Sequence, residues 1–75
     1  MKTDSLTSSI LVKINGEDKL IPQNISILKL IEMYKLTKDR VVIEVNKNIL
    51  KKDQYETTNI KSNDEVEIVT FVGGG

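Results

Sequence analysis

The residues that most clearly suggest a chemistry are the last three, Gly73, Gly74 and Gly75, which follow an apolar segment. Glycine loses more backbone entropy on ordering than any other residue and has no side chain, so this run does not stabilise a fold. A tail without Cβ atoms can, however, pass through a narrow channel. We expect Gly73 and Gly74 to thread into partner active sites and Gly75 to present its terminal carboxylate there. We exclude a phosphate-binding loop. In such a loop a helix follows the glycines and directs its N–H groups at the phosphate, and no helix follows Gly73, Gly74 and Gly75 here.

The side chains offer little other chemistry. The 75 residues include no cysteine and no histidine, which removes thiolate nucleophiles, zinc–thiolate sites and Ser–His pairs. The carboxylates of Glu44, Glu56, Glu65 and Glu67 are isolated, and strand alternation places Asp64 on the opposite face from Glu65 and Glu67. We therefore expect no catalytic residue, no metal site and no bound cofactor, and the chain is predicted not to be an enzyme.

Length and charge narrow the class further. Eleven basic residues balance eleven acidic ones, whereas a nucleic-acid-binding protein needs a basic surface. The longest apolar run is far too short to span a membrane. A chain of this length forms one domain, and below roughly 70–80 residues its core barely offsets the chain entropy. The classes of protein that remain are a small binding module, a carrier and a subunit of a larger assembly. We expect neither nucleic acid nor membrane as a partner.

The remaining residues predict the elements that must carry this tail. Residues 1–9 are polar and are expected to form a flexible arm, followed by a domain over 10–72 and the flexible glycine tail 73–75. Alternation over 10–15 and the Asn15-Gly16 turn predict a hairpin whose second strand is 17–21. Ser26 is a natural N-cap for a helix over 27–36, whose apolar stripe ends at Tyr34.

Further strands are expected at 41–46, 49–50 and 65–72, with Tyr55 and Ile60 anchoring the irregular segment 51–61. One helix packed on a mixed sheet of four to five strands, with the first and last strands central and parallel, is the β-grasp arrangement of the α+β class. A ferredoxin-like fold needs a second helix, and 51–61 has no helical periodicity.

A sheet covered by one helix leaves its other face open. Strand parity places Leu11, Val42, Val69 and Phe71 on that face. If the strands at 10–15, 41–46 and 65–72 are neighbours, these four side chains form a contiguous apolar patch beside the tail. Such patches often mark a partner interface, so we expect a docking surface.

Five segments resemble a known family, the sulfur carrier protein of thiamine biosynthesis (ThiS), which has a ubiquitin-like β-grasp fold. They are 14–17 (INGE), 26–31 (SILKLI), 41–46 (VVIEVN), 63–69 (NDEVEIV) and 71–75 (FVGGG). The resemblance covers residues 10–75. It implies that an E1-like adenylyltransferase uses ATP and magnesium to adenylate the Gly75 carboxylate. Sulfur derived indirectly from a cysteine desulfurase then gives a thiocarboxylate, which thiazole synthase consumes.

Related families leave alternatives open. The small subunit of molybdopterin synthase shares the fold and the thiocarboxylate, and a ubiquitin-like modifier would form isopeptide bonds through Gly75. A plain interaction module with an inert tail is a third possibility. The bias toward Lys, Ile and Asn is typical of an AT-rich genome, so a bacterial cytoplasm or a plastid stroma is expected. The chain is expected to be a monomer when free.

Overall fold

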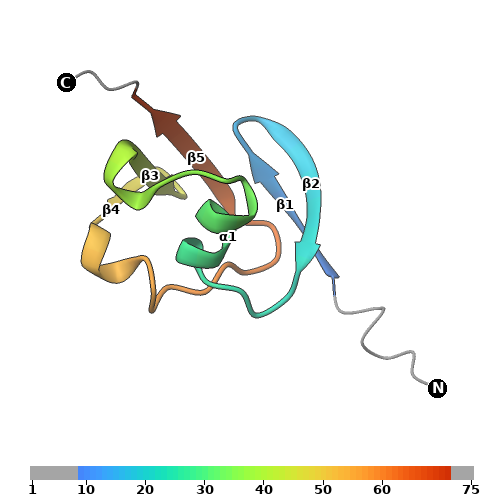
Figure 1. The fold of residues 1–75 in the computed structure, drawn as a ribbon. Coiled ribbons are helices and arrows are strands. Elements are labelled where there is room, and N and C mark those ends of the chain that lie inside the picture. The colour runs from blue at the N-terminus through green and yellow to red at the C-terminus, as the bar shows by residue number, and fades with distance from the viewer. Residues whose placement is uncertain (1–8, 72–75) are drawn as a thin grey trace.

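The computed structural model describes residues 9–71, which form one sheet and one α-helix (Figure 1). The elements in chain order are β1 (Ser9–Ile14), β2 (Glu17–Pro22), α1 (Ile27–Met33), a 3₁₀ turn (Lys38–Arg40), β3 (Val41–Val45), β4 (Asn48–Leu50), a second 3₁₀ turn (Lys52–Gln54) and β5 (Glu65–Thr70). The five strands lie in the order β2-β1-β5-β3-β4. β5 is parallel to β1 and antiparallel to β3, so the predicted α+β, β-grasp arrangement is confirmed.

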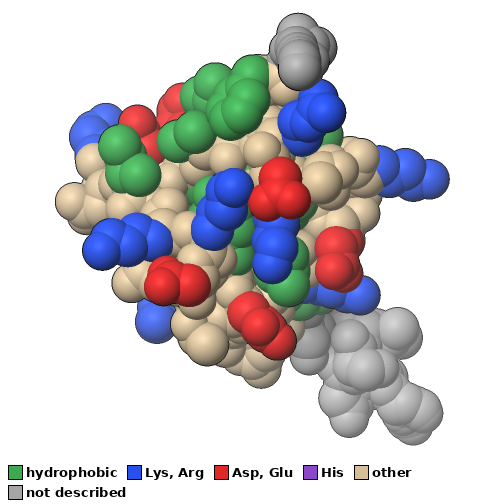
Figure 2. Space-filling model, turned by 60° about the vertical axis from the view of Figure 1, so that its left-hand side comes forward, with side chains coloured by type: hydrophobic (Ala, Val, Ile, Leu, Met, Phe, Trp, Pro, Cys, Tyr) green, Lys and Arg blue, Asp and Glu red, His purple; other side chains and the backbone are tan. Residues whose placement is uncertain are grey.

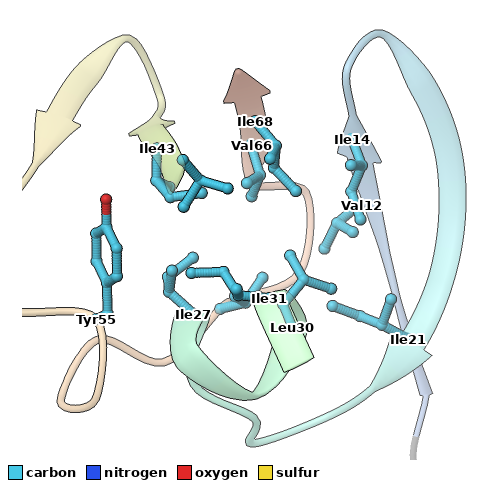
Figure 3. Close-up of a cluster of buried hydrophobic side chains, with 12 residues drawn as sticks. Val12, Ile14, Ile21, Ile27, Leu30, Ile31, Ile43, Tyr55, Val66 and Ile68 are labelled. Carbon is cyan, nitrogen blue, oxygen red and sulfur yellow. The ribbon is translucent and has the colours of Figure 1, made fainter. Parts of the chain in front are cut away.

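The core lies between α1 and one face of the sheet (Figure 3). Its buried side chains are Val12, Ile14, Ile21, Ile27, Leu30, Ile31, Val41, Ile43, Tyr55, Ile60, Val66 and Ile68. Most are β-branched, which suits a pleated surface and loses little rotamer freedom on burial. Tyr55 and Ile60 anchor the irregular segment, as predicted.

The hairpin between β1 and β2 turns at Asn15 and Gly16, which both adopt positive φ, 51° and 85°. This is the conformation that the Asn-Gly pair predicts. The Asn15 side chain has a second role that the sequence did not indicate, because its Oδ1 accepts a 2.7 Å hydrogen bond from the Ile68 N–H. β1 has ended by this point, so Asn15 takes the place of a ladder partner for β5.

Helix α1 begins as predicted, with Ser26 Oγ accepting a hydrogen bond from the Lys29 N–H at 3.0 Å. The irregular segment completes the cap, since the N–H groups of Ile27 and Leu28 donate to the carbonyls of Thr58 and Tyr55. The first N–H groups of a helix have no partner within it, and here those of Ile27, Leu28 and Lys29 donate to residues outside the helix.

The predicted end of the helix at residue 36 is wrong, because α1 ends at Met33. Lys35 takes a left-handed conformation with φ 60°. Its N–H donates to Glu32 O, and the Leu36 N–H donates to Ile31 O, which is the Schellman pattern of helix termination. Glycine normally occupies this position, so the lysine gave no signal. Tyr34 consequently lies at the C-cap, 40% exposed, rather than in the buried stripe.

The boundaries of the domain depart only slightly from those predicted. Ser9, placed in the arm by its composition, is the first residue of β1. The strand expected over 65–72 ends at Thr70. Residues 1–8 and 72–75 lie outside the described residues, so the flexible arm and the glycine tail remain predictions.

Candidate docking face and the C-terminal tail

The sheet has an open face opposite α1, built by strict alternation along its strands. In β3, Val41 and Ile43 are buried against the helix, whereas Val42 lies on the open face. In β5, Val66 and Ile68 are buried, whereas Glu65, Glu67 and Val69 are exposed. The parity argument therefore assigned the faces of the β3 and β5 residues correctly.

Three of the four predicted docking residues lie together at one end of this face. Val42 and Val69 are direct cross-strand partners. Phe71 continues the ladder beyond β5, its N–H donating to Arg40 O at 3.1 Å. The three side chains are 36%, 55% and 49% exposed, and we call them the tail-side patch. Figure 2 shows hydrophobic side chains gathered near the end of β5, with acidic side chains at the edge of the group.

Leu11, the fourth predicted residue, does not join this patch. The parallel register pairs Lys13 with Glu65, and the Asn63 N–H donates to Leu11 O at 2.7 Å. Leu11 is thus level with Asn63, two residues before the start of β5. Val69 is six residues further along the chain than Asn63, which is about 20 Å at ~3.3 Å per residue. The expectation of one contiguous patch of four residues is therefore wrong for Leu11, whose cross-strand neighbour is instead the exposed Leu20 of β2.

A charged band separates Leu11 and Leu20 from the tail-side patch. Lys13 Nζ lies 3.1 Å from Asp18, and Lys47 Nζ lies 3.8 Å from Glu65. Both pairs are exposed, and such pairs contribute little to stability. The open face therefore has one apolar end near the tail, one near the start of β1, and charges between them.

Sequence reasoning missed Ile49, which lies opposite Glu44 in the β3–β4 pair and is 70% exposed. Its position on the open face follows from the register of β4, and the isolated Ile-Leu dipeptide gave no register to read. Ile49 extends the apolar surface around Glu44 toward the β4 edge.

Gly73, Gly74 and Gly75 lie outside the described residues, and β5 leads toward them along the chain. Within residues 9–71 no group of three or more acidic, histidine or cysteine side chains could hold a metal ion. No helix of this same region is long and apolar enough to cross a membrane.

Known proteins are similar in sequence to this chain over most of its length. The ThiS family model matches residues 10–75. Sulfur carrier protein ThiS of Bacillus subtilis is 36% identical over 66 residues, which cover 87% of this chain and all of that protein. The uncharacterized protein ycf40 of Porphyra purpurea is 33% identical over 70 residues, covering 93% of this chain and 99% of its own.

A solved structure agrees with these sequence relatives. The crystal structure of the thiamine biosynthesis protein ThiS from Geobacter metallireducens matches with a TM-score of 0.75 and 25% identity, covering 88% of this chain and all of that one. The sheet order, the single helix and the family match lead to one conclusion. The chain belongs to the ThiS family, whose members are non-catalytic sulfur carriers of thiamine biosynthesis.

Proposed function

We propose that this chain carries sulfur as a thiocarboxylate on the backbone carboxylate of Gly75. The observation that carries the proposal is that the family match extends through residue 75 and so includes all three tail glycines. A chain without cysteine and histidine has no side chain suited to hold activated sulfur. The terminal carboxylate needs no side chain.

The chemistry requires activation, because a free carboxylate is a poor electrophile. An E1-like adenylyltransferase directs a Gly75 carboxylate oxygen to the α-phosphorus of ATP, and magnesium pyrophosphate leaves. A persulfide sulfur from a cysteine desulfurase relay attacks the acyl carbon and displaces AMP. A thiol reductant cleaves the resulting acyl disulfide, which leaves the thiocarboxylate. ATP and magnesium bind to the partner, and this chain holds no cofactor.

The tail-side patch is the proposed docking surface for these partners. Val42, Val69 and Phe71 lie where β5 leads into the tail, so a protein that covers them has the tail within reach. Apolar side chains of this kind form the desolvated centre of protein interfaces. Gly73 and Gly74 then thread toward the partner's active site, since a chain without Cβ atoms needs the narrowest channel. Leu11 lies outside this contact.

Thiazole synthase is the proposed acceptor of the sulfur. The similarity to a sulfur carrier protein ThiS favours this pathway over molybdopterin synthase or a protein modifier. Relatives in Porphyra purpurea and Bacillus subtilis are consistent with either a plastid stroma or a bacterial cytoplasm. The patch is small, and we propose that the free chain is a monomer.

The proposal is tested by separating the three possible fates of Gly75. The chain is incubated with ATP, its E1-like adenylyltransferase and a sulfur source, with and without thiazole synthase or the large molybdopterin synthase subunit. Turnover of the thiocarboxylate by thiazole synthase alone supports the proposal. Turnover by the molybdopterin enzyme alone, or a lysine-linked conjugate in place of a thiocarboxylate, contradicts it.

A further inference from the structure

The open face carries a like-charged pair that does not help the fold. Glu44 of β3 and Glu67 of β5 are direct cross-strand partners in the row next to Val42 and Val69. Directly opposed side chains in an antiparallel sheet have Cβ atoms about 4.5–5.5 Å apart. Like charges directly opposite each other destabilise a sheet, so this pair is expected to lower the stability of the domain.

Within residues 9–71 neither Glu44 nor Glu67 forms an ion pair. The ion pairs there are Lys13–Asp18, Lys19–Glu17, Lys47–Glu65 and Lys52–Asp39. On the β1 side, Asn15 of the turn lies level with Glu67. The Asn15 side chain carries no charge, and its Oδ1 already accepts a hydrogen bond from the Ile68 N–H. On the β4 side Glu44 faces Ile49. Glu65 lies two residues from Glu67 on the same face and adds further negative charge, though Lys47 is near it.

The surroundings of the pair point to a protein partner. The described residues contain no group of three ligands able to hold a metal ion, and Glu44 and Glu67 are only two. Apolar side chains border the pair instead, with Val42 and Val69 on the tail side and Ile49 on the β4 side. A centre of apolar contacts beside charged groups is the usual anatomy of a protein interface.

We propose that Glu44 and Glu67 together bind one arginine side chain of the E1-like adenylyltransferase when it covers the tail-side patch, an inference that rests on the proposed function. A guanidinium group is planar and has five donors, so it can bond both carboxylates at once. It is also more weakly hydrated than a lysine ammonium, which favours it where apolar neighbours exclude water. Binding converts a repulsive pair into a charge-assisted contact.

This arrangement predicts that stability and partner affinity change in opposite directions. The double variant Glu44→Gln/Glu67→Gln keeps the size of both side chains and removes their repulsion, so the thermal midpoint should stay the same or rise. The same variant loses both charges that hold the arginine, so affinity should fall. The matched control is Glu32→Gln/Glu56→Gln, which removes two exposed carboxylates elsewhere and gives the same change in net charge.

The experiment measures ATP–pyrophosphate exchange by the E1-like adenylyltransferase with the full chain as substrate. The double variant is expected to raise the KM for the carrier about tenfold or more, with kcat unchanged because the tail is intact. The wild-type KM should increase with ionic strength more steeply than that of the variant. The control should stay within twofold of the wild type and keep its salt dependence.

Two results would overturn the inference. One is a KM for the double variant equal to that of the wild type, and the other is an equal rise in the control, which would reveal a general effect of net charge. Failure of the wild-type chain to support any exchange is a different result, because it would overturn the proposed function itself.

Discussion

The two faces of the sheet are built from the same strands, yet one is buried against α1 and the other is exposed. On the face against α1, Ile43 is fully buried and Val66 is 1% exposed. On the open face, their neighbours Val42 and Val69 are 36% and 55% exposed. In β3 and β5 one side thus holds the domain together, and the other presents the tail-side patch.

In a carrier without reactive side chains, different residues of the same strand can therefore determine the stability of the fold and the binding of a partner. Alternation along one strand places a core residue and a proposed docking residue next to each other without conflict. Changes on the covered face should therefore act on folding, and changes at the tail-side patch should act on binding.

The largest effect is expected from Leu30→Ala, which truncates a helix side chain with 0% exposure and tests the role of the covered face in folding. Loss of buried apolar area and the cavity left behind should lower the free energy of unfolding by about 3–5 kcal/mol. For so small a domain this is most of its stability, and urea unfolding followed by circular dichroism should show a largely unfolded variant. Leu20→Ala, at a site 72% exposed, is the matched control and should change stability little.

Phe71→Ala tests the other side of the comparison. Truncation of a central aromatic anchor should weaken binding to the E1-like adenylyltransferase by about 2 kcal/mol, as for other interface hot spots, with the unfolding midpoint almost unchanged. Titration calorimetry measures the affinity. Leu11→Ala is the matched control on the same face, and equal losses for the two variants would contradict the separation of Leu11 from the patch.

Asn15→Gly tests how β5 is held at the centre of the sheet. Glycine adopts the positive φ of this turn, so the change removes mainly the acceptor for the part-buried Ile68 N–H. The free energy of unfolding should fall by about 1–2 kcal/mol. Asn24→Gly is the control, because Asn24 has φ 65° and its side chain makes no hydrogen bond within the described region. A loss as large in the control would assign the effect to glycine's chain entropy instead.

Lys35→Gly should give the smallest effect and the opposite sign. A left-handed conformation disfavours residues with a Cβ atom, so glycine at the helix end should raise the free energy of unfolding by about 0.5–1 kcal/mol. Partner affinity should stay the same, since Lys35 lies on the helix side. Lys35→Ala keeps the Cβ atom and should not stabilise; if it stabilises as much as glycine does, backbone strain is not the cause.

The parts of the fold that could be predicted were those with a local cause. Asn15-Gly16 specified its turn, Ser26 specified the helix start, and alternation specified which residues of β1, β3 and β5 face the core. The end of the helix could not be predicted, because Lys35 adopts a conformation that tertiary packing of Leu36 favours and its own type does not. The tail glycines could be named as a candidate site from the sequence, because three glycines in a row cost backbone entropy and add nothing to the stability of a fold.

The docking residues show a different reason for error. Parity gives the face of a residue and not its position along the sheet. Leu11 was misplaced because the Lys13–Glu65 register, set by contacts between residues far apart in sequence, cannot be read from either strand alone. Ile49 was missed for the same reason, since only its pairing with Glu44 places it on the open face.

The most direct test of the central claim is the intact mass of the chain after incubation with ATP, magnesium, its E1-like adenylyltransferase and a persulfide sulfur source. We predict a mass gain equal to one sulfur replacing one oxygen, located at Gly75 by fragmentation and absent when ATP is omitted or Gly75 is deleted. An unchanged mass in the complete reaction, or the same gain in the chain lacking Gly75, would contradict the account.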